Sequence, residues 1–313
     1  PSCVYRGSTS RQIRSHHGSK VGCPCWAVVV NTAHICHYTA AGSGASSLSY
    51  MGAASKRRSK NASASIQRLT VKCLEKSSGV NLPKASILLL QQLILFKVPP
   101  IVVRLAFVVL MMKGLDHTQD VRHVEYFSGD QAVTNAFLER GEVAIPFDVK
   151  NDPVYQSLNS DMGFVAAIHY NLKIACGGGF LAAPVCSSWV WVNQATAGRS
   201  ISQPLGKWRH PYVHRANIEV SRLVILCWMA MARGLMWVVE QPKGSLLEHH
   251  PRWQELTRRT KVFRWHVYMS AFGAQAPKAT WLYSNYPEIR NIHLFETGPP
   301  KKRKHMELAV HYK

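Results

Sequence analysis

A glycine turn and a downstream carboxylate are the features of this sequence whose types and spacing point most directly to chemistry. Gly129 ends a β-rich run that begins at Val121, and glycine adopts backbone angles that other residues avoid. Asp148 follows Phe127 by 21 positions, at the end of a second apolar run. Backbone N–H groups of such a turn can bind a nucleotide-type cofactor, and a carboxylate at this distance can accept both ribose hydroxyl protons.

The residues between the turn and the acid predict the elements that would position them. Residues 132–137 carry apolar side chains at a helical spacing, Gly141 is typical of a helix C-terminus, and residues 143–147 alternate as a strand does. Gln131, however, stands where a dinucleotide fingerprint has its second glycine. An ordinary buried strand–helix–strand unit therefore explains the same pattern.

The alternation of helices and strands continues along the chain. A helix is predicted to begin at residues 159–160 and to end at the glycines 177–179, followed by a strand over 180–183. A second pair follows, with a helix over 218–233 and a strand over 235–239. This pattern predicts an α/β fold with a doubly wound, mostly parallel sheet.

Four functional groups follow predicted strands directly. They are Gly129, Asp148, Cys186 and Glu240. Because ligands of parallel sheets bind at the carboxyl ends of the strands, these groups are expected to share one edge. Polar residues also follow strands by chance, which is the simpler alternative.

The charge of the chain indicates a polyanionic partner. Its 313 residues carry 38 Lys and Arg against 17 Asp and Glu, a net charge of +21. Nucleic acid and an acidic membrane face both fit this charge, and the charge alone does not choose between them.

Two stretches interleave cations with aromatic rings, over 207–215 and 252–265. Cations neutralise phosphates and rings stack on bases, so both stretches are candidates for a nucleic-acid groove. A solvated surface above core aromatics is the alternative. The cations singled out are Lys207, Arg209, Arg215, Arg258, Arg259 and Lys261.

The first part of the chain is expected to lack a fold of its own. Residues 1–85 contain 12 Lys and Arg, a single acid, Glu75, and many Ser, Gly and Ala residues, which predicts disorder. The zinc-type side chains within this region are Cys23, Cys25, His34, Cys36 and His37, but their spacing fits no standard zinc finger, so no metal site is predicted there.

The adjacent His249 and His250 would point apart on a helix or a strand, so no metal site is predicted at this pair either.

The apolar run 86–112 is long enough to cross a membrane. Lys97 and Arg104 would each cost about 2.5–3.5 kcal/mol near the bilayer centre, and the Pro99–Pro100 pair divides the run. Packed helices or a strand beside the main domain are favoured, with membrane attachment as the alternative.

The remaining expectations concern location and domain limits. Eight irregularly spaced cysteines favour a reducing compartment, and the basic run 299–304 resembles a nuclear import signal, which favours the nucleus. The predicted organisation is a basic region over 1–85, an apolar flanking segment over 86–114, the α/β domain over 115–298 and a basic tail over 299–313.

Over about residues 121–290 the motifs resemble class I S-adenosylmethionine-dependent methyltransferases, and more narrowly the cytosine-5 DNA methyltransferases. That family has a Phe-x-Gly turn after the first strand, an acid after the second, a Pro-Cys motif and a Glu-Asn motif, in this order. The turn corresponds to Phe127, Ser128 and Gly129, and the other motifs correspond to Asp148, Cys186 and Glu240.

The resemblance implies a Rossmann-like fold, S-adenosylmethionine as cofactor, and methylation of cytosine carbon 5 in a nucleic acid, with DNA favoured as the partner. Phe127, Ser128, Gly129 and Asp148 would bind the cofactor. Cys186 would be the nucleophile, partly ionised by a helix N-terminus at Ser187–Ser188 or a nearby Arg, and would add to a base extruded from its stack. Glu240 would stabilise the adduct.

The sequence departs from the family at several points. Val185 separates Pro184 from Cys186, and Glu240 is followed by Gln241–Pro242. There is no Gln-x-Arg-x-Arg segment, and only 29 residues lie between Pro242 and Phe272, where the family has a target-recognition domain. A noncatalytic basic nucleic-acid-binding module on the same fold is therefore the second hypothesis, and a membrane-attached protein is the third.

Overall fold

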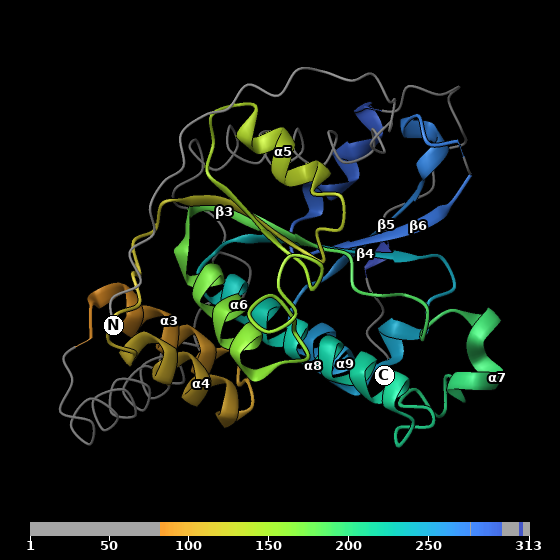
Figure 1. Ribbon diagram of the computed structural model, residues 1–313, viewed down its shortest axis with the longest axis horizontal. Coiled ribbons are helices and arrows are strands. Elements are labelled where there is room, and N and C mark those ends of the chain that lie inside the picture. The colour runs from red at the N-terminus through yellow and green to blue at the C-terminus, as the bar shows by residue number, and fades with distance from the viewer. Residues whose placement is uncertain (1–81, 276, 296–306, 309–313) are drawn as a thin grey trace, which may run out of the picture.

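The computed structural model describes residues 82–275, 277–295 and 307–308 (Figure 1). Residues 1–81 of the region 1–85 expected to be disordered, the zinc-type side chains from Cys23 to His37 and the import-like run 299–304 lie outside the described residues, so these expectations stay predictions. Residues 82–85 are described, and α3 begins at Lys84.

A mixed sheet of seven strands forms the centre of the fold, in the order β2-β1-β3-β4-β6-β5-β7. The first four strands of this order are mutually parallel, whereas β6 is antiparallel to β4 and β5, and β7 is antiparallel to β5. The expected α/β class is confirmed, but the sheet is mixed and not mostly parallel, since three of the six described strand pairings are antiparallel. The strands are β1 (Val121–Tyr126), β2 (Ala144–Phe147), β3 (Ile174–Ala182), β4 (Met236–Pro242), β5 (Phe263–Tyr268), β6 (Ala279–Ser284) and β7 (Glu307–Leu308).

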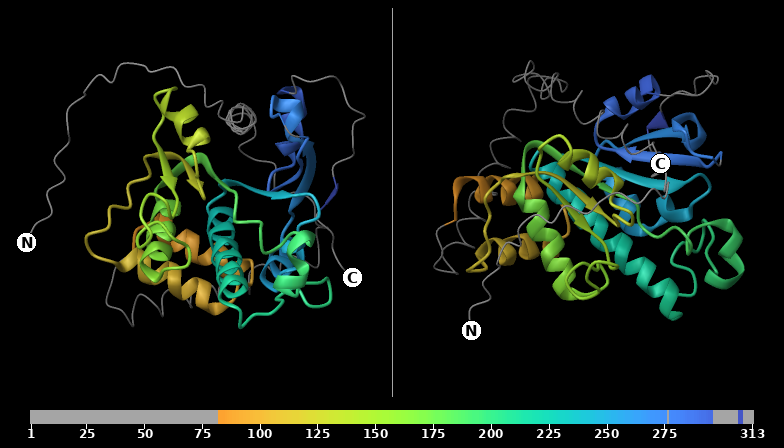
Figure 2. Two further views of the ribbon diagram at one scale, coloured as in Figure 1. Left: turned by 45° about the vertical axis from the view of Figure 1, so that its right-hand side comes forward. Right: turned by 45° about the horizontal axis from the view of Figure 1, so that its top comes forward.

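Helices cover both faces of the sheet, as a doubly wound α/β fold requires (Figures 1 and 2). On one face α5 (Ala132–Leu138) and the 3-10 segment η4 (Pro287–Phe295) pack against side chains such as Leu181 and Val238. The larger core on the other face includes Phe180 and Trp237. It is covered by α3 (Lys84–Leu95), α4 (Pro100–Met111), α6 (Asp161–Lys173), α8 (Pro211–Ala232) and α9 (Pro251–Arg259).

Glycines 177–179 do not end a helix, contrary to expectation. They lie inside β3, and α6 already ends at Lys173, after which Ile174 is extended. A Cβ on Gly178 would lie 2.5 Å from the Arg122 carbonyl oxygen, and one on Gly179 would lie 2.4 Å from that of Met236. These glycines therefore allow the neighbouring strands to approach closely.

Glu240 lies within β4, not after it. The pairing of β4 with β3 stops at Val239, but its pairing with β6 continues through Glu240, Gln241 and Pro242. The sequence could not show this extension, because it depends on a strand some 40 residues downstream.

The helix α8 begins at Pro211, seven residues before the expected start, because proline suits the first position of a helix.

The apolar segment around residues 86–112 forms the two helices α3, which ends at Leu95, and α4, which begins at Pro100. Leu90, Leu93 and Ala106 are fully buried in the same hydrophobic core as side chains of the sheet. None of the helices in the described ranges combines the length and apolar character that crossing a bilayer requires.

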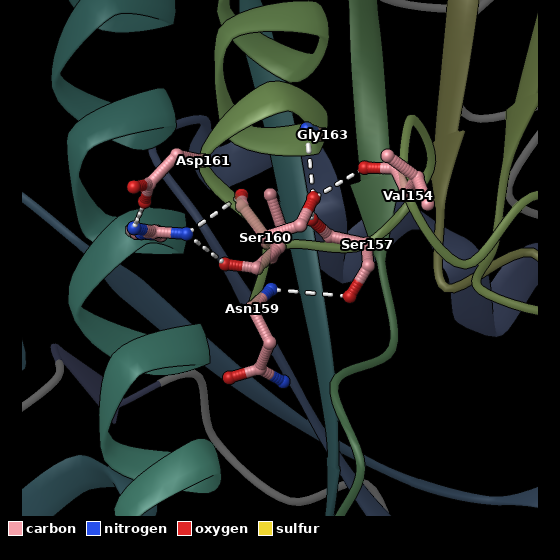
Figure 3. A network of polar contacts seen from close by, with 8 residues as sticks. Val154, Ser157, Asn159, Ser160, Asp161 and Gly163 are labelled. Carbon is pink, nitrogen blue, oxygen red and sulfur yellow. Dashed lines mark hydrogen bonds and ion pairs between the residues drawn. The ribbon is translucent and has the colours of Figure 1, made fainter.

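A polar network fixes the start of α6 (Figure 3). The Ser160 hydroxyl caps the helix by accepting from the Gly163 backbone N–H at 2.9 Å and donates to the Val154 carbonyl. From α8, Arg222 donates to the carbonyls of Leu158 and Ser160 at 2.9 and 2.8 Å, and pairs with Asp161. The loop that follows β2 is thereby fastened to both helices.

We expect Gly163→Ala to destabilise the protein by about 1–3 kcal/mol, because overpacking forces backbone shifts. The new Cβ would lie 2.2 Å from the Ser157 carbonyl oxygen and 2.7 Å from the capping Ser160 hydroxyl. Chemical denaturation measures the change. Met162→Ala, at an exposed position of the same helix, is the matched control and should change stability little; equal stabilities of the two variants would contradict the close contact.

Candidate functional site

The register of the sheet brings the expected groups to one edge. Phe147, Tyr126, Ala182 and Val239 are successive partners across β2, β1, β3 and β4. The segments that carry Gly129, Asp148 and Cys186 leave the sheet just beyond this row, and Glu240 is the next residue of β4. The expectation of a common carboxyl edge is met for all four residues.

The turn after β1 has an unusual backbone. Phe127, Gly129 and Gln131 all have positive φ angles, of 59°, 50° and 57°. The Phe127 and Ser128 N–H groups donate to the Phe147 carbonyl at 2.8 and 3.2 Å, which ties the turn to the end of β2. Two non-glycine residues in the left-handed region indicate that surrounding contacts hold this turn in one conformation.

Asp148 completes this tie. One carboxylate oxygen accepts from the Gly129 N–H at 2.9 Å, and the other accepts from the Lys150 N–H at 2.8 Å. The side chain is buried. The acid expected to bind a ribose thus also fixes the turn, and its two oxygens keep further acceptor capacity for a ligand.

Glu125 is a buried acid beneath the turn that sequence reasoning missed. One of its oxygens accepts from both the backbone N–H and the hydroxyl of Thr134, each at 2.7 Å. Burial raises the pKa of Glu125, and the nearby Asp148 raises it further. An acid within the predicted strand was the available signal, and its role is to cap α5.

The donors at the turn fit a polar ligand. The Ser128 hydroxyl is buried and has no hydrogen-bond partner among the described residues, although buried hydroxyls are normally satisfied. Beside Gly129, an added Cβ would meet no atom within 4 Å, so the space next to its backbone is open. An unsatisfied hydroxyl beside open space is what a site for a cofactor's polar groups would show.

Cys186 lies on a turn that leaves the end of β3. Its carbonyl accepts from the N–H groups of Trp189 and Val190 at 2.8 and 3.2 Å. Ser187 and Ser188 belong to this turn, so the expected helix N-terminus at these residues is absent and cannot ionise the thiol. The thiol itself is half-buried.

The charges around Cys186 come from Glu240 and Lys278. Burial raises the pKa of Cys186, while Lys278 lowers it and Glu240 raises it. Lys278 also pairs with Glu240, with 3.0 Å between Nζ and the carboxylate oxygen. The positive charge expected from an arginine is therefore supplied by Lys278, which sequence reasoning missed because it lies in a loop far along the chain.

Gln241 positions the segment that leads to Cys186. Its side-chain N–H₂ group donates to the Pro184 carbonyl at 2.8 Å, and its side-chain oxygen accepts from the Ser245 hydroxyl at 2.8 Å. Gln241 is fully buried, so both bonds are shielded from water. The residue after Glu240, which departs from the family motif, thus holds the Cys186 loop against β4.

The opposite influences of Lys278 and Glu240 predict opposite changes in thiol reactivity. Because only the thiolate is alkylated, Lys278→Met should raise the pKa of Cys186 and slow its alkylation at a fixed pH near neutrality. Glu240→Gln should lower the pKa and accelerate the reaction. Mass spectrometry of the Cys186 peptide after timed iodoacetamide treatment measures both rates, and changes in the same direction would contradict this arrangement.

The six cations expected to bind nucleic acid are all exposed but form two separate groups. Lys207, Arg209 and Arg215 lie around the start of α8, beside the carboxyl edge, since the other end of α8 leads into β4. Arg258, Arg259 and Lys261 lie where α9 leads into the start of β5, which runs parallel to β4. The two groups therefore lie on different elements, one around the start of α8 and the other at the end of α9.

Metal-type side chains do not cluster in the described part of the chain, where no group of three or more potential ligands occurs. Of the histidine pair, His250 is buried and caps α9 by accepting from the Arg252 N–H at 3.2 Å. Burial lowers the pKa of His250 to about 3, so it is neutral at physiological pH.

A small cavity of about 20 Å³ lies at the other end of the sheet, lined by Arg122, His123, Phe137, glycines 177–179 and Met236. It has room for about one water molecule. The strands enter the sheet at this end, so the cavity is separate from the edge that carries Cys186.

Comparisons with protein-family models, with curated protein sequences and with solved structures gave no match. Function must therefore be inferred from the residues and their geometry.

Proposed function

We propose that this protein is an S-adenosylmethionine-dependent methyltransferase acting on cytosine carbon 5 of nucleic acid, with DNA as the favoured substrate. The observation that carries the proposal is the placement of the Gly129 turn, Asp148, Cys186 and Glu240 at one edge of the sheet. The motifs that resemble the cytosine-5 enzymes are far apart in sequence, so a common edge is required if they act together.

The turn would hold the cofactor, whose role when bound is to present an electrophilic methyl group. The Ser128 hydroxyl, unsatisfied within the described residues, is available to the cofactor's polar groups. Asp148 fixes the turn and retains acceptor capacity for ribose hydroxyls. Phe127 and Gly129 shape the turn through their positive φ angles.

Cys186 would act on the base. Its thiolate adds to the ring carbon next to carbon 5, which gives carbon 5 the electron density needed to accept a methyl group. A water molecule would then take the proton from carbon 5, and the electrons of that C–H bond would expel the Cys186 thiolate, leaving methylated cytosine and S-adenosylhomocysteine. Glu240, hydrogen-bonded to the ring, would stabilise the covalent adduct.

The Lys278–Glu240 pair supports a link between substrate binding and activation of the thiol. Without substrate, burial and Glu240 raise the pKa of Cys186. A cytosine that hydrogen-bonds to Glu240 would weaken the influence of that carboxylate on the pKa of Cys186. The lowering of the pKa by Lys278 would then be the larger effect. The thiolate would then form when the base is in place.

A noncatalytic nucleic-acid-binding module is the second candidate. Two observations favour it. Burial raises the pKa of Cys186, so the thiol stays protonated near neutral pH, and Asp148 already accepts hydrogen bonds from the backbone N–H groups of Gly129 and Lys150. This candidate predicts salt-sensitive binding of nucleic acid that does not depend on the cofactor. A nuclear location remains a proposal that rests on the run 299–304.

Covalent trapping tests the proposal. The full chain is incubated with S-adenosylmethionine and oligonucleotides, single-stranded or duplex, that contain 5-fluorocytosine, whose fluorine blocks release of the enzyme. We expect a denaturation-resistant complex whose adduct maps to Cys186 by peptide mass spectrometry. No complex with either oligonucleotide, or an adduct at another cysteine, would exclude the assignment of Cys186 as nucleophile.

A further inference from the structure

We propose that residues 185–210, here called the rim excursion, form a docking surface for an unpaired nucleic-acid strand, with Trp191 and Trp208 as stacking platforms. The inference deepens the proposed function and rests on it for the position of the target base. The rim excursion connects β3 to α8 and contains the short helix α7 (Gln194–Ala197), which projects beyond the sheet (Figures 1 and 2).

A single buried arginine holds the rim excursion in shape. Arg199 is 3% exposed, and its guanidinium lies over the ring of Trp189, 3.5 Å from the centroid. It donates to the carbonyl and the hydroxyl of Ser188 at 2.8 and 2.7 Å. Further bonds reach the Pro204 carbonyl at 2.5 Å, the Asn217 side-chain oxygen at 2.8 Å and the Val213 carbonyl at 3.3 Å.

These bonds join the beginning of the excursion to its end and to α8. Burial lowers the pKa of Arg199 to about 10, so the guanidinium is still charged at neutral pH and its bonds to carbonyls are charge-assisted. A connection fixed in this way presents its outer side chains in defined positions, which reduces the ordering cost of binding.

The outer side chains are large and apolar. Trp191 is 71% exposed, Val192 69%, Ile201 69% and Trp208 56%. Two tryptophans this exposed on one anchored connection are unusual for a surface that meets only water, and such surfaces mark interaction sites. The rings are flat and exposed, which suits stacking.

The charge of this region selects the class of partner. No Asp or Glu occurs between Asp161 and Glu219, whereas Lys207, Arg209 and Arg215 are all exposed there. The Arg209 guanidinium lies 5.3 Å from the centroid of Trp208, so a cation and a ring are presented together. Cations for phosphates beside rings for bases fit a nucleic acid better than an apolar protein or an acidic membrane.

An unpaired strand fits better than a duplex. Protein rings can stack only on bases whose faces are free, and a duplex covers those faces with neighbouring base pairs. The excursion starts at the residue before Cys186, so a strand lying along it would pass close to the thiol. Bases held there would already be outside a helical stack, which removes the cost of extruding the target base.

The test measures fluorescence anisotropy of labelled single-stranded and duplex oligonucleotides with the full chain, without cofactor and at a salt concentration that suppresses nonspecific binding. We expect tighter binding of the single strand, and at least about a tenfold loss for Trp191→Ala combined with Trp208→Ala. Arg209→Gln should reduce the salt dependence of binding. Ile101→Ala, an equally exposed apolar position on α4, is the control and should bind as the unaltered chain does.

Unchanged single-strand affinity in the double tryptophan variant, or preferential binding of duplex, would overturn the docking surface. Both tryptophans are exposed, so thermal melts of the double variant should match those of the unaltered chain. The outcomes for the docking surface and for the methyltransferase proposal can be told apart. If binding depends on the two tryptophans but no adduct forms at Cys186, the docking surface is supported and the catalysis is excluded. If the double variant keeps both its affinity and the adduct at Cys186, only the docking surface is excluded.

Discussion

Replacing Cys186 by alanine is expected to reduce methyl transfer to cytosine by at least about a thousandfold, because among the described cysteines Cys186 is the one that follows β3 at the carboxyl edge. The half-buried thiol lies where Glu240 and Lys278 both influence its pKa. Transfer of a radiolabelled methyl group from S-adenosylmethionine to an oligonucleotide measures the loss. Cys176→Ala, which removes an exposed thiol near the opposite end of β3, is the matched control and should retain activity.

Retention of activity in the Cys186 variant would show that any methyl transfer proceeds without this nucleophile. Loss of activity in both cysteine variants would point to a general effect on the fold, which melting curves of the two proteins would reveal. Only a loss confined to Cys186→Ala agrees with its assigned role.

Replacing Asp148 by alanine is expected to weaken both the fold and cofactor binding. The substitution removes the charged acceptor of the N–H groups of Gly129, which is partly buried, and of Lys150, which is exposed. A hydrogen bond to a charged group contributes about 1.5–3 kcal/mol, and less where water can replace the acceptor. We therefore expect a stability loss of roughly 2–4 kcal/mol in chemical denaturation. The affinity for S-adenosylmethionine should fall by at least about tenfold, because the turn and a ribose acceptor are lost together.

Asp130→Ala is the control for this prediction, since Asp130 is an exposed aspartate two residues after Ser128. The control should keep both its stability and any affinity for the cofactor. If Asp148→Ala were as stable as the control, the two hydrogen bonds would not be fixing the turn.

The elements that the sequence predicted best are those with short-range signals. The strand that ends before Gly129, the helix over 132–138 and the strand that ends at Phe147 were anticipated to within a residue or two at most boundaries. Alternation of apolar residues and turn glycines are local patterns, so one sequence suffices to read them.

The sequence failed where distant strands decide the outcome. Glycines 177–179 have the composition of a helix stop, but close approach to Arg122 and Met236 places them inside β3. Pairing with β6 extends β4 through Glu240, a residue that was expected to follow the strand. Neither neighbour is visible from local periodicity.

The candidate site shows the same division. Gly129, Asp148, Cys186 and Glu240 could be placed at one edge from the sequence, because each follows or ends a predicted strand. Lys278 and Gln241 could not be assigned, since their roles depend on side-chain contacts with Glu240 and Pro184. The two groups of basic residues looked alike in sequence, but one lies around the start of α8 and the other at the end of α9.

Calorimetric titration of the full chain with S-adenosylmethionine tests most directly whether the carboxyl edge is a cofactor site. We predict saturable heat with a dissociation constant tighter than about 1 mM, and its loss in Asp148→Ala but not in Asp130→Ala. Absence of heat at millimolar cofactor in the unaltered chain, or equal binding by both variants, would contradict the account.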